Sequence, residues 1–315
     1  MDSLAGTLAR MADVALLLPD LLLIIAGALI CRFTPLGRPI WDGAERLVYH
    51  VLFPTLLFTS ILRSPQPPST LLPLVGAGLV VSLAGIALAL PLARLPGVDR
   101  RLHASGAQVA YRFNTFVALA VSERLAGSAG LAWTALIVAV CVPVVNVAAV
   151  WPLARQSGRG LARELARNPL IVATLAGLLG QAVGLRLPEV VMAAAGRIGS
   201  AALPVGLMAV GAGLQFGALR EGPALAAGLM AIRHLLLPLV GIALAWGLKL
   251  PAAQQAVLVV FAAVPASSSA YVLAARMGGH GAYVAGLVTL STLVALPGLP
   301  LALTAWRWAG TLAAH

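Results

Sequence analysis

Long apolar stretches, each close to the length of a membrane-crossing helix, follow one another along the whole chain. A helix needs about 20 apolar residues to cross the hydrocarbon core of a bilayer. A transmembrane β-barrel would show shorter segments that alternate apolar and polar positions, so the continuous runs exclude it. The pattern predicts an all-α integral membrane protein with these ten spans: Val14–Cys31, Ala44–Leu62, Leu71–Leu92, Ala104–Val121, Gly130–Leu153, Pro169–Leu185, Val190–Phe216, Ala224–Leu248, Ala252–Ala275 and Ala282–Trp306.

Composition agrees with this pattern, because 60% of the 315 residues are hydrophobic and only 10% are charged. Soluble domains of this size do not have such a composition. The net charge of +11 comes from basic residues between the spans, so we read it as topology control rather than nucleic-acid binding. Cys31 and Cys141 give neither metal-ligand spacing nor a disulfide framework, and we expect no metal and no cofactor.

The basic residues also predict an orientation. With ten spans, 12 Lys and Arg residues fall on one side of the membrane and 6 on the other. The side with more positive charge faces the cytoplasm, which places both termini outside. The connection at residues 154–168 is then cytoplasmic, and its four arginines recur at helical spacing. It is either a short amphipathic surface helix or a basic loop that contacts anionic headgroups.

The two halves of the chain resemble each other. The segment Pro54–Phe58 in span two has a counterpart in Pro204–Met208 in span seven, an offset of 150 residues. A repeat with an odd number of spans must be inverted across the membrane, as in many transporters. We therefore expect a first repeat at 1–153, the basic loop at 154–168 and a second repeat at 169–315.

Two spans carry polar groups near mid-depth, where lipid tolerates them least. One is span four, around Gln108–Val121, and the other is span nine, around Val260–Ala275. Two such patches, one in each half, predict a substrate site built from discontinuous helices. The candidate binding residues are Arg112, Asn114, Thr115, Pro265, Ser267, Ser268 and Ser269.

Pro265 lacks a backbone donor and clashes with the preceding turn, so span nine is expected to break there. Residues 266–269 would then begin a half-helix whose free N–H groups and positive dipole end can hold a carboxylate. The alternative is a proline kink whose serines bond back to their own helix. Arg112 either helps to bind an anion or forms a structural pair, and Asn114 is expected to face the site.

Four further polar residues lie inside spans. Asn146 either bonds a neighbouring helix or lines the site. Asp20 is the only acid well inside a span and is a candidate protonatable group, although a structural role is the alternative. Arg233 and His234 could pair with Asp20 or form part of a proton path, or they could be structural.

Six motifs occur in the order seen in a known family: PTLLF at Pro54–Phe58, RFNTFVALA at Arg112–Ala120, NPLIVATLAGLL at Asn168–Leu179, LPVGLMAVGAGL at Leu203–Leu214, AAVPASSSAYVLA at Ala262–Ala274 and TLSTLVALPGLP at Thr289–Pro300. With these motifs the chain resembles the auxin efflux carrier family, which includes the plant PIN proteins and many bacterial permeases. The resemblance implies ten helices in two inverted five-helix repeats, with broken helices four and nine that cross, as in sodium–bile acid symporters. It also implies a transport domain that moves against a scaffold domain, and a homodimer.

The resemblance further implies transport of carboxylates such as auxin, malonate or malate. Asn114 and Pro265 match the two crossover positions, and Asn146 matches a site asparagine in helix five. Plant members have proline where this chain has Phe113, and their long central loop is reduced here to about fifteen residues. The short loop points to a bacterial inner-membrane protein.

We therefore expect a secondary active transporter of a small organic anion that works by alternating access. A passive channel on the same fold is one alternative. A cation–proton exchanger is another, although it would usually place an aspartate where this chain has asparagine and serine. An intramembrane enzyme would need paired catalytic groups or clustered metal ligands, which the spans do not contain.

Overall fold

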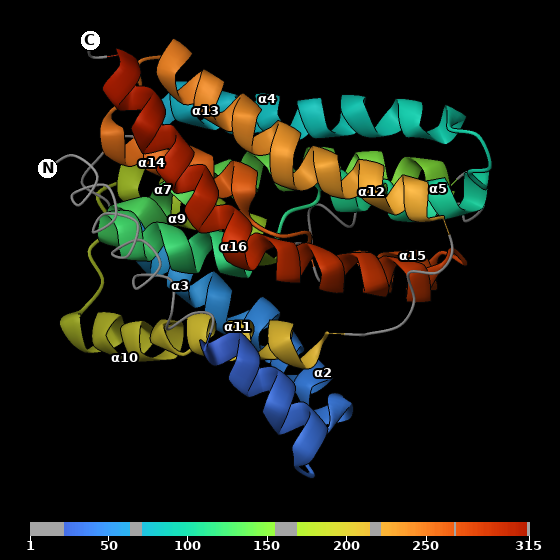
Figure 1. The fold of residues 1–315 in the computed structure, drawn as a ribbon. Helices are drawn as coiled ribbons and strands as arrows, with labels where there is room; N and C mark the ends of the chain where they lie inside the picture. Colours follow the sequence, from blue (N-terminus) through green and yellow to red (C-terminus); the bar gives the residue numbers. More distant parts are fainter. Residues whose placement is uncertain (1–21, 64–70, 155–168, 215–221, 268, 314–315) are drawn as a thin grey trace, which may run out of the picture.

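The computed structural model describes residues 22–63, 71–154, 169–214, 222–267 and 269–313. These residues form helices and turns, with one isolated β-bridge (Figure 1). The first helix is Leu22–Phe33. It is followed by α2 (Arg38–Leu47), η1 (Val48–Leu52), α3 (Phe53–Leu62), α4 (Leu72–Ala89), η3 (Leu90–Arg94), α5 (Arg100–Gly106), α6 (Gln108–Tyr111), α7 (Thr115–Ala154), α9 (Pro169–Ala182), α10 (Glu189–Ser200), α11 (Ala202–Ala212), α12 (Pro223–Ala231), η4 (Ile232–Leu236), α13 (Leu237–Gly247), α14 (Ala252–Ala263), α15 (Ser269–Arg276) and α16 (Gly281–Ala313).

Five helices in the described ranges are long and apolar enough to cross a membrane: Leu72–Arg94, Thr115–Leu153, Glu189–Ala212, Pro223–Gly247 and Gly281–Gly310. The chain is thus an all-helical membrane protein. The predicted count of ten spans in an inverted repeat is not shown by these helices and stays a prediction. Part of the difference has a clear cause, because predicted spans four and nine are each divided into short pieces.

The segment α7 joins the second piece of predicted span four to predicted span five. Its backbone leaves the helical region at Ala126 and Gly127, and Gly127 adopts a φ of 60°. Glycine takes this left-handed conformation without the steric cost that a side chain would add. The chain can therefore turn sharply and continue as a second helix.

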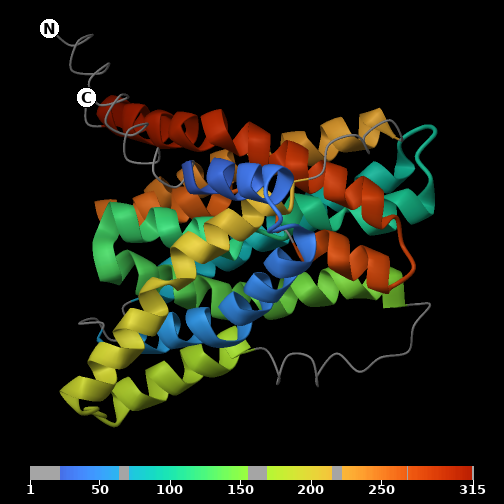
Figure 2. The same ribbon diagram turned by 90° about the horizontal axis from the view of Figure 1, so that it is seen from below.

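The helices form two packed groups. The small helix group consists of Leu22–Phe33, α2, η1, α3, α9, α10 and α11, in which α3 packs on α9 and α10 while α2 packs on α11. The large helix group contains α4 to α7 and α12 to α16. Figure 2 shows α9 and α10 at one side of the molecule and α16 at the other. Helix α7 contacts both groups, so it connects them.

Two glycines allow one close crossing within the small helix group. A Cβ added to Gly27 would overlap the carbonyl oxygen of Met208, and one added to Gly211 would overlap that of Ile24. Small residues let membrane helices approach until their backbones touch, which increases van der Waals contact. The two glycines therefore fix the helix Leu22–Phe33 against α11.

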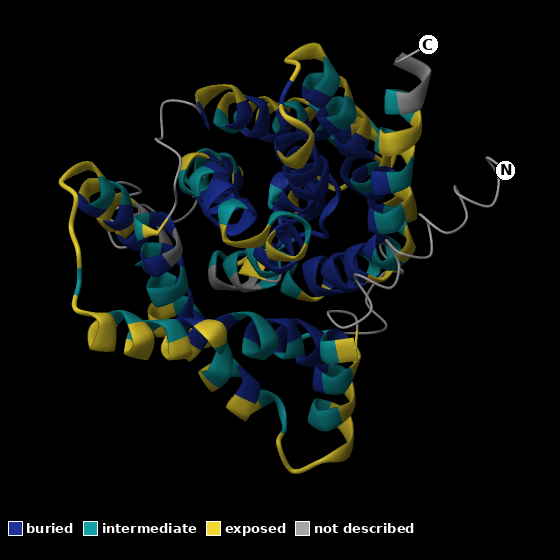
Figure 3. Ribbon diagram, turned by 90° about the vertical axis from the view of Figure 1, so that its left-hand side faces the viewer, coloured by how far each residue is buried: buried dark blue, intermediate teal, exposed yellow. Residues whose placement is uncertain are grey.

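Helix α14 lies at the centre of the large helix group. Every residue from Gln254 to Ala263 is buried. Figure 3 shows buried residues gathered where helices pack against one another and exposed residues toward the outside. A helix that is apolar on all sides needs neighbours on all sides. The end of α14 at Ala263 therefore places the following break deep inside the protein.

Candidate functional site

The two predicted breaks meet each other. The chain leaves the helical conformation at Arg112 (ψ 120°) and at Val264 (ψ 154°). Phe113 in the first break and Ala266 in the second form an antiparallel bridge. The Asn114 N–H donates to the Pro265 carbonyl at 2.8 Å, and the Ser267 N–H donates to the Arg112 carbonyl at 2.9 Å. Each break therefore satisfies backbone groups that the other exposes, as irregular backbone inside a membrane requires. We call this pair of breaks the crossing.

Asn114 directly precedes α7 and caps it. Its Oδ1 accepts hydrogen bonds from the backbone N–H groups of Phe116 at 3.0 Å and Val117 at 3.2 Å. An asparagine at this position is a strong N-cap. Because two donors point at one end of the amide, that end is the oxygen, and the other end is Nδ2. This Nδ2 is buried and has no hydrogen-bond partner in the described part of the chain.

The first break forms without a proline. Phe113 is buried, and its ring packs on that of Phe261 in α14 with 4.5 Å between the ring centroids. Aromatic packing and the bridge to Ala266 hold this residue outside the helix. Thr115, the first residue of α7, is partly buried, and its hydroxyl makes no hydrogen bond to the described residues.

The described part of the half-helix after Pro265 is α15, which runs from Ser269, within the expected start at residues 266–269. Before it, the Ala266 N–H donates to Ser291 Oγ at 2.8 Å, and the Ser267 N–H is used in the crossing. Ser267 Oγ lies 3.0 Å from Ser269 Oγ. The predicted site residue Ser268 lies outside the described residues.

Arg112 reaches from the first break to the second. Its Nη1 donates to Gln108 Oε1 at 2.7 Å, and its Nη2 donates to Ser269 Oγ at 3.0 Å. Both acceptors are neutral, so neither of them compensates the positive charge of the guanidinium. Gln108 was not among the predicted site residues, although its position four residues before Arg112 puts the two on one helix face.

Arg233 and His234 also contact the second break, directly or through Ser291. Arg233 Nε donates to the Val264 carbonyl at 2.7 Å. His234 Nε2 lies 2.8 Å from Ser291 Oγ, the same oxygen that accepts from Ala266. Both residues belong to the π-helix η4, a local widening that often occurs at functional sites. Their suggested partner Asp20 lies outside the described residues.

Asn146 lies in the second helical part of α7 and is partly exposed. Its side chain makes no hydrogen bond to any described residue, so it is not part of the hydrogen-bonded crossing. The structure thus brings together Arg112, Asn114, Pro265, Ser267 and Ser269, and leaves Asn146 outside their network.

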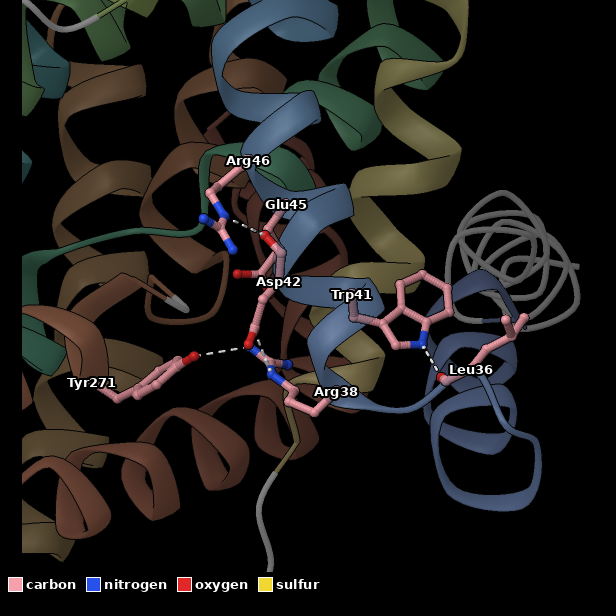
Figure 4. A network of polar contacts seen from close by, with 7 residues as sticks. All are labelled: Leu36, Arg38, Trp41, Asp42, Glu45, Arg46 and Tyr271. Carbon is pink, nitrogen blue, oxygen red and sulfur yellow. Dashed lines mark hydrogen bonds and ion pairs between the residues drawn. The ribbon is translucent and has the colours of Figure 1, made fainter.

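A second polar network connects the two helix groups near the crossing (Figure 4). Arg38, at the start of α2, forms ion pairs with Asp42 at 2.9 Å and Glu45 at 3.2 Å. Its Nη2 also donates to the Tyr271 hydroxyl in α15 at 2.8 Å. Burial alone would lower the pKa of Arg38, but Glu45, Tyr271 and Asp42 outweigh it and raise the pKa above its ordinary value. Arg38 is therefore a permanent cation in this link.

Comparison with known proteins gives a match to one family. A family model described as membrane transport protein, the model of the auxin efflux carriers, matches residues 152–303. No curated protein matches the sequence. The matched region contains the second break at Pro265 but does not contain the first break at Arg112 and Asn114.

Proposed function

We propose that this chain, which belongs to the membrane transport protein family of the auxin efflux carriers, moves a small organic anion across the membrane by secondary active transport. The family consists of membrane transporters and not of enzymes. The protein is accordingly a multi-pass membrane protein. The proposal concerns the substrate, a carboxylate such as malonate, malate or an auxin-like acid, and the mechanism of alternating access.

The single observation that carries the substrate class is the Nδ2 of Asn114. It is a buried donor without an acceptor in the described part of the chain, while the oxygen of the same amide is held by the α7 backbone. An unsatisfied buried donor costs about 1–3 kcal/mol. A carboxylate oxygen at the crossing would remove this cost, and so would any other strong acceptor.

Charge narrows the choice among acceptors. Among the described residues, the hydrogen bonds of the Arg112 guanidinium go to the neutral groups of Gln108 and Ser269. A cation in a membrane interior is costly unless an anion or a water-filled space compensates it. An anionic solute would compensate it during each transport cycle, whereas a transported cation would be repelled. This supports an organic-anion carrier over a cation–proton exchanger.

The two helix groups support alternating access. One face of the crossing is held by the large helix group, and α15 is linked to the small helix group through Tyr271 and Arg38. A movement of one group against the other would expose the crossing first to one side of the membrane and then to the other.

The finer architecture belongs to the same proposal. We infer ten spans in two inverted repeats at 1–153 and 169–315, joined by a cytoplasmic loop at 154–168. Both termini would then face the periplasm of a bacterial inner membrane, and the protein would form a homodimer. Cysteine labelling from each side of the membrane tests the orientation, and crosslinking in native membranes tests the dimer.

The test of the substrate site is uptake by proteoliposomes that contain the variant Asn114→Asp. Aspartate keeps an oxygen for the N–H groups of Phe116 and Val117, so α7 stays capped. It loses the NH₂ donor and adds a negative charge, so uptake of labelled mono- and dicarboxylates should fall by at least about tenfold. A thermal unfolding midpoint equal to that of the wild type shows that the fold is intact.

Two outcomes would oppose the proposal. Uptake by Asn114→Asp at the wild-type rate would remove Asn114 from the site. Flux that neither saturates nor shows counterflow of labelled substrate would identify a channel rather than a carrier.

A further inference from the structure

Arg233 is among the largest fully buried side chains in the protein. It is 1% exposed and belongs to the π-helix η4, between α12 and α13. Its Nε donates to the Val264 carbonyl at 2.7 Å, and its Nη2 lies 3.4 Å from the Phe261 carbonyl. Because α14 ends at Ala263, both oxygens belong to the last turn and cap of that helix. The guanidinium thus sits on the C-terminal end of the second broken helix.

This cation has no acidic partner among the residues that the structure describes. The ion pairs of the crossing region are those of Arg38 with Asp42 and Glu45. A buried charge without a counter-charge needs other compensation. Here the compensation is the negative end of the α14 dipole and the carbonyl groups that a helix leaves unpaired at its C-terminus.

Free cations use the same chemistry in other carriers. In transporters built from broken helices, unwound carbonyls and half-helix C-terminal ends coordinate the Na⁺ that drives transport. In this chain the guanidinium of Arg233, which is covalently attached, contacts the corresponding carbonyl oxygens, those of Val264 and Phe261. The neighbouring residue His234 holds the next part of the same break through Ser291 and the Ala266 N–H. Two consecutive residues of η4 therefore fix Val264 to Ala266 from one side.

We infer that Arg233 is a tethered cation that occupies the place of a free coupling ion at the second break. The inference rests on the proposed function as an anion carrier. It has two consequences. The wild-type carrier needs no Na⁺ at this position, and removal of the side chain leaves a cluster of carbonyl oxygens that a small free cation can fill. Arg233 acts through the backbone of the break, so it is a positioning residue.

The test compares thermal unfolding of purified full-length protein in sodium, choline and guanidinium chloride at equal, millimolar concentration. For the wild type, sodium and choline should give the same midpoint. Arg233→Ala should lower the midpoint by about 5 °C in choline, because two charge-assisted contacts are lost. Guanidinium should restore at least half of this loss in the variant and should not raise the wild-type midpoint. Arg233→Lys, which keeps the charge, should stay close to the wild type in all three salts.

A matched control is Arg197→Ala. Arg197 also lies within a predicted span, in α10, but its side chain is exposed. Its removal should not create a salt-specific stabilisation, so guanidinium and choline should give the same midpoint for this variant.

Three results would overturn the inference. The first is a wild-type midpoint that rises in sodium relative to choline. The second is an Arg233→Ala protein that responds equally to the three salts. If Arg233→Ala does not fold, Arg233→Gln replaces it, since glutamine keeps a donor and loses the charge. The third result is an Arg233→Gln protein whose thermal midpoint and sodium-free uptake both equal those of the wild type.

The readout by unfolding needs no substrate, so the two proposals can fail separately. If no carboxylate is transported but Arg233→Ala is stabilised by guanidinium, the tethered cation stands and the substrate class is wrong. If carboxylates are transported only with sodium by the wild type, the substrate class stands and the tethered cation is wrong.

Discussion

Arg38 in α2 and Tyr271 in α15 are joined by a hydrogen bond of 2.8 Å that connects the small helix group to the large one. The same guanidinium is held on its other side by Asp42 and Glu45. Arg38 is thus positioned by its own helix before it reaches across, so the contact is organised from the side of α2.

Tyr271→Phe should weaken this link without disturbing α2. The lost hydrogen bond is partly exposed and should cost about 1 kcal/mol, which lowers the thermal midpoint by about 2–4 °C. Arg38→Ala should cost more, because Asp42 and Glu45 are then left beside each other without their cation. Thermal unfolding of the two single variants and the double variant measures the coupling.

The control for this link is Arg46→Ala. In the part of the chain that the structure describes, Arg46 bonds the Asp42 carbonyl at an exposed position, so its loss should stay within about 0.5 kcal/mol. Strict additivity of the Arg38 and Tyr271 substitutions would show that the contact carries no energy.

Arg112→Gln should reduce transport while leaving the fold in place. Glutamine can still bond Ser269 but carries no charge, so the ratio of maximal rate to half-saturating concentration should fall by about tenfold to a hundredfold. Arg112→Lys, which keeps the charge but loses the two-pronged geometry, should lie between glutamine and wild type. Initial rates of carboxylate uptake over a range of concentrations measure both, and equal values for glutamine and wild type would contradict a charge role.

Asn146→Ala tests whether this residue touches substrate. Since Asn146 makes no hydrogen bond to the described residues, its replacement should change stability by less than about 0.5 kcal/mol. If it lines the path, the half-saturating concentration should rise several-fold at an unchanged thermal midpoint. Unchanged kinetics would remove Asn146 from the proposed site.

Ser291→Ala should be clearly destabilising. Ser291 is fully buried, and its oxygen accepts from the Ala266 N–H and contacts His234. Its loss leaves a buried donor unsatisfied at a cost of about 1–3 kcal/mol. Ser122 offers a matched control, because it is equally buried but its hydroxyl has no partner in the described part of the chain. Ser122→Ala should therefore be neutral or stabilising, and equal losses for the two serines would refute this explanation.

The breaks themselves could be predicted from local chemistry. Pro265 has no N–H, and Arg112 and Asn114 place polar groups where lipid offers no partner. The partner of the Ala266 N–H could not be predicted, because its acceptor Ser291 lies in another helix. Local pattern indicates where a helix can break, whereas the hydrogen bonds that hold the break depend on residues far away in the sequence.

The position of Arg233 was equally hidden. Periodic patterns assume a regular helix, and the π-helix η4 changes the register at that residue. The sequence offered Asp20, which lies outside the described residues, as one partner for Arg233. Among the described residues the guanidinium contacts the carbonyl groups of Val264 and Phe261. Every residue has a backbone carbonyl, so the amino-acid sequence does not indicate which carbonyl groups accept hydrogen bonds from Arg233.

The mutual pairing of the two breaks also constrains how the protein is made. Arg112 and Ser269 are 157 residues apart in the chain, yet the backbone around each satisfies the other. While the ribosome is still completing the second half, the peptide groups at residues 112 and 114 have no final partner and must be shielded by water or by the insertion machinery. The N-terminal half cannot reach its finished form in the bilayer alone, and assembly has to wait for residues 265–267 to arrive.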